Sequence, residues 1–234
     1  MSADGTVGLM KELGVSKIAG SVIGKIMPSG ECPWSYVREM NDEMLSLWDK
    51  YGDFYIPGFH IHPHYVRESC EEIEAMSKKG LKLIGELVPY WMGWELDYSS
   101  KELSEILDVA EQYHMVVSFH SMWEDAMDKM VREHPGIVFV AAHPGEYGEF
   151  CRHMERMKFS ENYYLDTSGY GIFRHGMLRH AVDLFGAERF IFGSDYPTCN
   201  PAMYLGGVVL DPTITDSEAE LILSKNAKRI LGIK

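Results

Sequence analysis

Short apolar segments recur along the chain, and each ends in polar or glycine-containing turns. Seven of them predict β-strands, because their apolar residues run continuously or alternate over about four to eight positions. Runs that are apolar on both faces are typical of buried parallel strands. The predicted strands span residues 17–24, 54–62, 81–88, 115–120, 137–143, 162–169 and 189–197.

Between these strands, apolar residues at spacings of three and four predict amphipathic helices. We expect helices at residues 5–13, 37–51, 66–79, 100–113, 126–131, 178–184 and 217–231. Ser99 with Glu102, and Thr215 with Glu218, match capping boxes at two helix starts. The segment from Asp195 to about Pro212 is interpreted as a loop.

Regular alternation of strands and helices indicates parallel strands with right-handed crossovers, in either a barrel or a doubly wound sheet. A doubly wound sheet usually carries a glycine-rich phosphate turn, and the sequence contains neither G-x-G-x-x-G nor G-x-x-x-x-G-K-[ST]. We therefore predict an α/β fold, a (β/α)8-type TIM barrel with seven recognisable strands. Barrels of about 200 to 250 residues commonly form one domain, so residues 1–234 are expected to be a single domain.

The net charge restricts the possible binding partners, and the cysteine content indicates the cellular compartment. A net charge of −13 without clustered Lys or Arg argues against nucleic acid or an anionic membrane as a partner, and leaves a small-molecule substrate. The four cysteines show no C-x-x-C spacing and are typical of reduced thiols. No apolar run approaches the about 20 residues that span a bilayer. We expect a cytoplasmic protein. The sequence leaves open whether it forms a homo-oligomer.

Polar residues end several predicted strands. In a parallel barrel the carboxyl ends of all strands face one mouth, so Glu86, His120, His143 and Asp195 are expected to converge there. Imidazole and carboxylate together suit a divalent metal such as zinc, which lowers the pKa of bound water to about 7. A neighbouring carboxylate can take the proton of that water.

Structural roles compete with these functional ones. A histidine at a strand end can equally be a core residue bonded to the backbone, and Asp195 can cap a turn. The H-x-H at His60 and His62 places two imidazoles on one strand face, which suits a metal or a substrate. Tyr90 and Trp91 belong to an aromatic loop that either packs internally or forms a substrate wall.

Several segments together resemble the metal-dependent hydrolases of the second amidohydrolase family. They are SFH (118–120), AAHPGE (141–146), YLDTSGY (164–170), FGSDYP (192–197) and KNAKRILGI (225–233). Their order and spacing carry the resemblance, which runs from about residue 7 to the C-terminus. It implies a (β/α)8 barrel, in a family that includes hydrolases, lactonases and nonoxidative decarboxylases of aromatic acids.

The resemblance also implies roles for single residues. His120 matches the fifth-strand metal ligand, and His143 matches the sixth-strand histidine that binds a second metal or acts catalytically. Asp195 matches the eighth-strand ligand and proton acceptor, and Glu86 occupies the fourth-strand position. The H-x-H of the family's first strand has no counterpart here, so we expect either a piece of a longer chain or a protein without that strand.

These observations favour a metal-dependent hydrolase of a small-molecule ester, lactone or amide, with Asp195, His143 and Glu86 as catalytic groups. The predicted metal ligands are His120, His143 and Asp195, and the predicted substrate-binding residues are His60, His62, Tyr90 and Trp91. Two alternatives stay open. One is nonoxidative decarboxylation of an aromatic carboxylic acid on the same scaffold, and the other is a metal-free binding protein.

Overall fold

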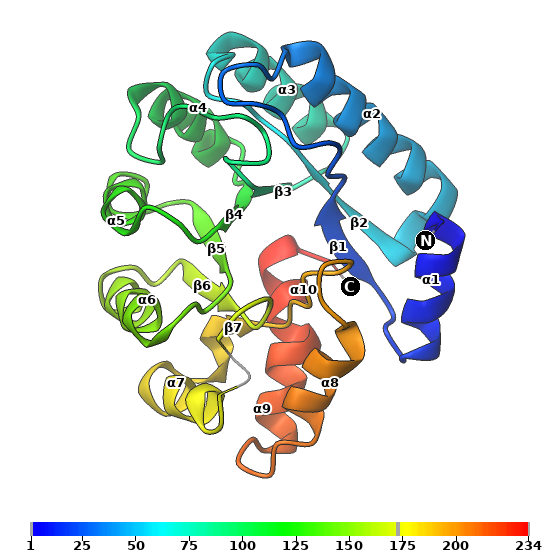
Figure 1. The fold of residues 1–234 in the computed structure, drawn as a ribbon, viewed down its shortest axis with the longest axis vertical. Coiled ribbons are helices and arrows are strands. Elements are labelled where there is room, and N and C mark those ends of the chain that lie inside the picture. Colours follow the sequence, from blue (N-terminus) through cyan, green and yellow to red (C-terminus); the bar gives the residue numbers. More distant parts are fainter. Residues whose placement is uncertain (1, 172–173, 234) are drawn as a thin grey trace.

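The computed structural model describes residues 2–171 and 174–233. Its strands form one parallel sheet in the order β1-β2-β3-β4-β5-β6-β7, which confirms the seven predicted strands. They are β1 (Ile18–Ser21), β2 (Tyr55–Phe59), β3 (Leu83–Leu87), β4 (Val116–His120), β5 (Val138–Ala142), β6 (Tyr163–Asp166) and β7 (Phe190–Ile191). Figure 1 shows the sheet as a curled half-barrel, the arrangement of a TIM barrel that lacks one strand.

The helices surround this sheet mainly on its convex side, except that the last of them packs against the barrel interior (Figure 1). They are α1 (Ala3–Glu12), α2 (Trp34–Tyr51), α3 (Val66–Lys78), α4 (Lys101–Gln112), α5 (Glu124–Glu133), α6 (Tyr147–Phe159), α7 (Met177–Phe185), α8 (Pro201–Val209), α9 (Asp216–Glu220) and α10 (Asn226–Leu231). A π-helical segment, Leu221–Lys225, joins α9 to α10, and 3₁₀ turns at Gly52–Phe54 and Ala187–Arg189 precede β2 and β7.

Two helices were not expected from the apolar pattern. The predicted loop after Asp195 was wrong, because α8 occupies Pro201–Val209. Asn200 caps this helix by accepting a hydrogen bond from the backbone N–H of Ala202, and Pro201 suits the first helical position. Helix α8 is apolar on most sides, so it lacks the periodic pattern by which amphipathic helices are recognised. Helix α6 was also missing from the expected set.

One predicted capping box was displaced by a residue. Ser100, and not Ser99, caps α4 by accepting a hydrogen bond from the N–H of Leu103 at 3.3 Å. Ser99 instead donates its hydroxyl to Asp97, which competes for it locally. The box of Thr215 and Glu218 at the start of α9 is confirmed.

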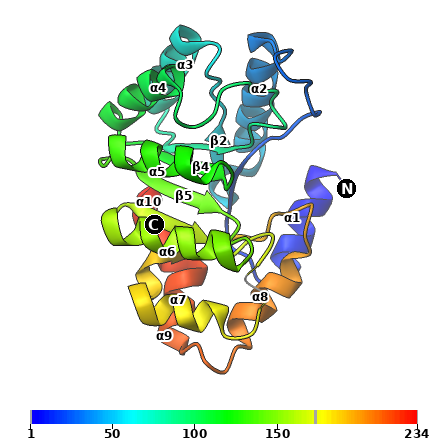
Figure 2. The same ribbon diagram turned by 60° about the vertical axis from the view of Figure 1, so that its left-hand side comes forward.

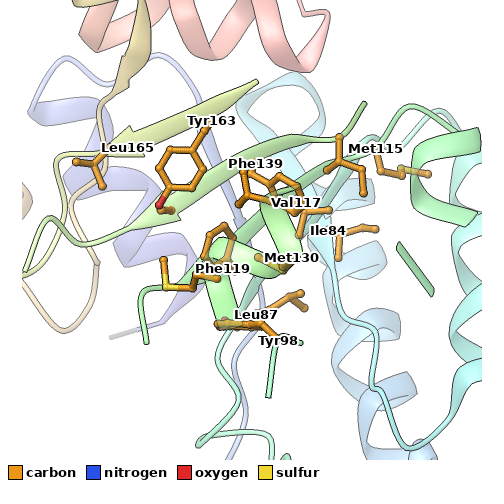
Figure 3. Packing of buried hydrophobic residues seen from close by; sticks show 14 of the residues in the cluster. Ile84, Leu87, Tyr98, Met115, Val117, Phe119, Met130, Phe139, Tyr163 and Leu165 are labelled. Atoms are coloured by element: carbon orange, nitrogen blue, oxygen red, sulfur yellow. The ribbon is translucent and has the colours of Figure 1, made fainter. Parts of the chain in front are cut away.

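The buried core has two parts, one on each face of the sheet. Figure 3 shows the larger part, where Val117, Phe119 and Phe139 pack with Met130 of α5. Because side chains alternate along a strand, the residues between them face the barrel interior. There Val116, Val140 and Tyr164 form a second cluster with Leu231 of α10.

The N-terminal helix contacts the segment that follows the last strand. Figures 1 and 2 both show α1 beside α8, and the Thr6 hydroxyl lies 3.2 Å from that of Tyr196. This contact links the two edges of the open sheet. None of the helices in the described part of the chain is long and apolar enough to cross a membrane.

Candidate metal centre at the carboxyl ends of the strands

His120 points into the barrel mouth because of strand periodicity. It lies two residues beyond Ser118 and four beyond Val116, a member of the interior cluster, so all three share one face of β4. By the same alternation, Asp166 shares the interior face of β6 with Tyr164. The interior is therefore apolar where the strands begin and polar where they end.

Glu86 reaches the same mouth through an irregularity in β3. Ile84 pairs with Val117 and Leu87 pairs with Phe119, so β3 has one more residue than β4 over this stretch. The bulge keeps both Ile84 and Leu87 in the outer core and turns Glu86 toward His120.

Glycine is required at the residue before Glu86. Gly85 has φ +89, and a Cβ there would lie 2.2 Å from the carbonyl oxygen of Ser118. A larger residue would force the bulge away from β4, so Gly85 keeps Glu86 within reach of the neighbouring strands.

Glu86 lies between two histidines from the next strands. Its Oε1 is 3.2 Å from Nδ1 of His120 and 3.5 Å from Nε2 of His143. The rings of the two histidines are 4.7 Å apart, centroid to centroid. One ligand atom from each of the three residues lies within 4.8 Å of the others. One carboxylate and two imidazoles at this spacing fit a divalent metal such as zinc.

The pKa values of Glu86 and His143 are set by burial, by their hydrogen bonds and by the charges of neighbouring groups. Burial raises the pKa of Glu86, but hydrogen bonds from His120 and His143 outweigh burial and bring that pKa down to about 2. Burial lowers the pKa of His143, but the hydrogen bond to Glu86 and the charges of Asp166, Glu86 and Asp195 raise it to about 9. The site therefore attracts positive charge, which a cation can supply in place of a proton.

Asp195 faces this cluster from the other edge of the sheet. It follows β7 with φ +53, a left-handed conformation that Asp tolerates better than most residues. Burial raises the pKa of its carboxyl group, which also accepts a 3.6 Å hydrogen bond from the thiol of Cys199. The structure thus brings Asp195 near the histidines, but only Glu86, His120 and His143 form the compact donor set among the described residues.

A pocket of about 350 Å³ opens over the cluster. Its lining residues are His120, Ser121, His143, Gly145, Glu146, Glu149, Gly169, Tyr170 and Asp195. No Lys or Arg is among these described residues, whereas three of them are carboxylates. Glu146 forms an ion pair with Arg174, so the acidic character of the lining comes mainly from Glu149 and Asp195.

His60 and His62 lie elsewhere. Both are fully buried, and neither lines the pocket. Nε2 of His60 is 2.8 Å from the carbonyl oxygen of Val22, and Nε2 of His62 is 3.1 Å from that of Met92. Burial lowers both pKa values to about 4. The structure thus places the H-x-H pair where it holds two loops to the core.

The two aromatic residues that were predicted to bind substrate have different surroundings. Tyr90 is half exposed, and its ring meets the ring of His120 edge-on at 5.2 Å. Trp91 donates from Nε1 to the carbonyl oxygen of Gly24 at 2.9 Å, which ties the loop after β3 to the loop after β1. Tyr90 therefore borders the histidines, while Trp91 supports the loop.

Ser168 was not among the residues singled out from the sequence, yet it contacts His143. Its hydroxyl lies 2.9 Å from Nδ1 of His143 and 2.7 Å from both oxygens of Asp166. The signal that could have found it in the sequence is the D-T-S-G motif, which begins at the last residue of β6. Gly169 has φ +62, and a Cβ there would lie 2.2 Å from the imidazole, so glycine lets this segment close over the ring.

Comparison with known proteins bears on the family and the fold. A family model described as amidohydrolase matches residues 36–233. A search of curated proteins by sequence finds no match.

Solved structures share the fold. A 2,6-dihydroxybenzoate decarboxylase from Rhizobium superimposes with a TM-score of 0.78 and 16% identity, over 99% of this chain and 88% of the other. A 5-carboxyvanillate decarboxylase from Sphingomonas paucimobilis superimposes with a TM-score of 0.74 and 15% identity, over 100% of this chain and 84% of the other. A dihydroxybenzoic acid decarboxylase from Polaromonas sp. JS666 was solved with bound manganese and the inhibitor 2-nitroresorcinol. It superimposes with a TM-score of 0.73 and 16% identity, over 99% of this chain and 86% of the other.

Proposed function

Given that this chain belongs to the amidohydrolase family, we propose that it is a metal-dependent hydrolase of a small-molecule ester, lactone or amide. The observation that carries the proposal is the convergence of Glu86, His120 and His143, with Asp195 across the same pocket. Three protein donors beside an open pocket are typical of catalytic metal sites, which keep one position for water or substrate.

Members of this family bind a divalent metal, and here Glu86, His120 and His143 would hold it. We propose zinc, because two imidazoles and one carboxylate form a common catalytic zinc set; manganese, bound by one structural relative, is the competing ion. A divalent ion supplies Lewis-acid polarisation of a carbonyl oxygen and a lower pKa for water.

Asp195 is the proposed general base. Its carboxylate lines the pocket and lies outside the compact donor set, so it is free to accept a proton from the attacking water. Burial raises the pKa of its carboxyl group, which makes the carboxylate a stronger base for the proton of water. His143 would contribute as a ligand, because the ion that it holds would polarise the substrate oxygen on which negative charge develops.

The charge of the pocket favours a neutral substrate. Glu146, Glu149 and Asp195 line it, and none of its described lining residues is Lys or Arg. A substrate with its own carboxylate would meet repulsion from Glu149 and Asp195, whereas the charge of Glu146 is offset by its ion pair with Arg174. Esters, lactones and amides carry no such charge.

Decarboxylation of an aromatic acid is the second candidate. Tyr90 stands edge-on to His120 and offers an aromatic surface beside the cluster. The structural relatives named above are decarboxylases of dihydroxybenzoic and carboxyvanillic acids. If the substrate is an aromatic acid, the bound ion would have to offset the negative charge of the carboxylates that line the pocket.

One experiment separates the candidates. Protein loaded with zinc or with manganese is incubated with phenyl esters, lactones and anilides, and separately with hydroxybenzoates while carbon dioxide is measured. Hydrolysis that disappears in Asp195→Asn supports the proposal. Carbon dioxide release without hydrolysis would replace it with the decarboxylase, and protein that binds neither metal would favour a metal-free binding role.

We also propose a cytoplasmic location. All four cysteines are free thiols, as expected for a reducing compartment. Fusion to a fluorescent protein, followed by cell fractionation, tests this. Recovery of the protein outside the cytoplasm would contradict it.

A further inference from the structure

Asp166 forms a buried hydrogen-bonded cluster behind His143. Oδ1 of Asp166 accepts hydrogen bonds from the backbone N–H of His143 at 3.0 Å and from that of Ser168 at 2.9 Å. The hydroxyl of Ser168 lies 2.7 Å from each oxygen of the same carboxylate. The side of His143 that faces away from Glu86 is therefore attached to a defined set of polar groups.

Counting protons assigns the direction of each bond. A serine hydroxyl has one proton, and a carboxylate that already receives two N–H bonds acts as an acceptor. The proton of Ser168 therefore belongs to the bond with Asp166. Toward Nδ1 of His143, at 2.9 Å, the hydroxyl can only accept, so Nδ1 must carry a proton.

We propose that Ser168, held by Asp166, is a positioning residue that keeps the proton of His143 on Nδ1 and so presents Nε2 to Glu86 and the metal. This inference rests on the proposed function in one respect, namely that a metal binds beside Nε2. A ligating imidazole must offer an unprotonated nitrogen, and a partner on its other nitrogen sets which one that is.

The surrounding backbone holds this arrangement in place. Ser168 is 2% exposed, so water does not compete for its hydroxyl. Gly193 packs against Asp166, where a Cβ would lie 2.4 Å from Oδ2, and the hydroxyl of Thr167 donates to the Gly193 carbonyl at 3.1 Å. The ends of β6 and β7 are thus joined directly behind the histidine.

The two histidines of the cluster present different ring nitrogens to Glu86. His120 presents Nδ1 to Glu86, at 3.2 Å, whereas His143 presents Nε2, at 3.5 Å. Only with the proton of His143 kept on the far nitrogen can both rings offer lone pairs to one ion. Ser168 supplies the acceptor that makes this possible on the side of His143.

The test compares Ser168→Ala with Ser69→Ala. Ser69 is an equally buried serine whose hydroxyl bonds the backbone N–H and carbonyl of His62 at 3.0 Å each, so both variants lose one buried hydroxyl beside a histidine. Zinc affinity is measured by calorimetry on the full chain. We expect Ser168→Ala to weaken it by about 10- to 100-fold, as is typical for loss of a ligand's outer partner, and Ser69→Ala to leave it within twofold.

A second readout requires no metal. In metal-free protein labelled with ¹⁵N-histidine, ring-nitrogen spectra are recorded above pH 9, where His143, whose pKa is raised to about 9, is neutral and carries one ring proton. Wild type should show that proton on Nδ1, and the signal is assigned to His143 by its absence in His143→Asn. Ser168→Ala should shift the proton toward Nε2, while Ser69→Ala should leave it on Nδ1. An unchanged signal in Ser168→Ala would overturn the inference, as would unchanged zinc affinity. If wild type binds no metal at all, the proposed function fails, and the proton signal still decides the inference.

Discussion

Two pairs of histidines follow strands of the same sheet, and their surroundings are opposite. His60 and His62, after β2, place their Nε2 atoms against backbone carbonyl oxygens, and burial lowers both pKa values to about 4. His120 and His143, at the ends of β4 and β5, share the carboxylate of Glu86, and the pKa of His143 is raised to about 9.

The difference shows that the partner of a buried histidine decides its chemistry. A carbonyl dipole does not offset the loss of hydration, so the ring stays neutral and acts as a structural link between segments. A carboxylate carries a full charge, which outweighs desolvation and favours a cation. The predictions below test whether function is confined to the pair that shares a carboxylate.

The largest expected effect is on turnover. Asp195→Asn should lower kcat by about 10²- to 10⁴-fold, the range for loss of a general base, because the amide cannot accept the proton of water. Steady-state kinetics of the zinc-loaded protein measure it. Asp216→Asn, at the start of α9, is the control and should retain full activity. Unchanged kcat in Asp195→Asn would exclude this residue as the base.

The next largest expected effect is a loss of zinc affinity when the negative charge of Glu86 is removed. Glu86→Gln should weaken zinc binding by at least about 100-fold, because even the loss of an outer partner costs about 10- to 100-fold. Competition with a chromophoric chelator measures this. Glu74→Gln, on the exposed side of α3, carries the same chemical change away from the site. Equal affinities in the two variants would show that Glu86 is not a ligand.

The carbonyl-bonded pair should contribute to the loss of stability in acid. In the unfolded chain a histidine takes up a proton near pH 6.5, but folded His60 and His62 do so only near 4, so between these values the unfolded state holds more protons. The free energy of unfolding should therefore fall with decreasing pH in this window, by up to about 1.4 kcal/mol per pH unit for each residue.

Urea denaturation between pH 6.5 and 4 measures this slope in metal-free protein. His62→Gln removes one titrating group, so its slope should be smaller than that of wild type even if the variant is less stable overall. A slope equal to that of wild type would mean that His62 takes no part in acid destabilisation.

The smallest effect should come from the aromatic border of the pocket. Tyr90→Leu removes a ring whose contacts are worth about 0.5–1.5 kcal/mol, which corresponds to about a two- to tenfold higher KM for aromatic substrates. Aliphatic esters of similar size should show no change. A uniform rise in KM for both classes would indicate a general distortion of the loop after β3.

The comparison of histidines also marks the limit of sequence-based prediction. His60, His62, His120 and His143 all lie at the carboxyl ends of predicted strands, so position along the chain does not distinguish them. Strand ends converge in any parallel barrel, and this brought His120, His143 and Asp195 to one pocket as expected. Which histidine meets a carboxylate depends on residues of other strands.

Local pattern alone determined the seven strands, most of the surrounding helices and the carboxyl-end location of the candidate site, because periodicity and strand-end position are properties of neighbouring residues. Tertiary structure decided what the pattern could not encode. A bulge against β4 turned Glu86 inward, neighbouring loops covered His60 and His62, and the pairing of β5 with β6 brought Ser168 to His143. These outcomes depend on distances between segments far apart in the chain.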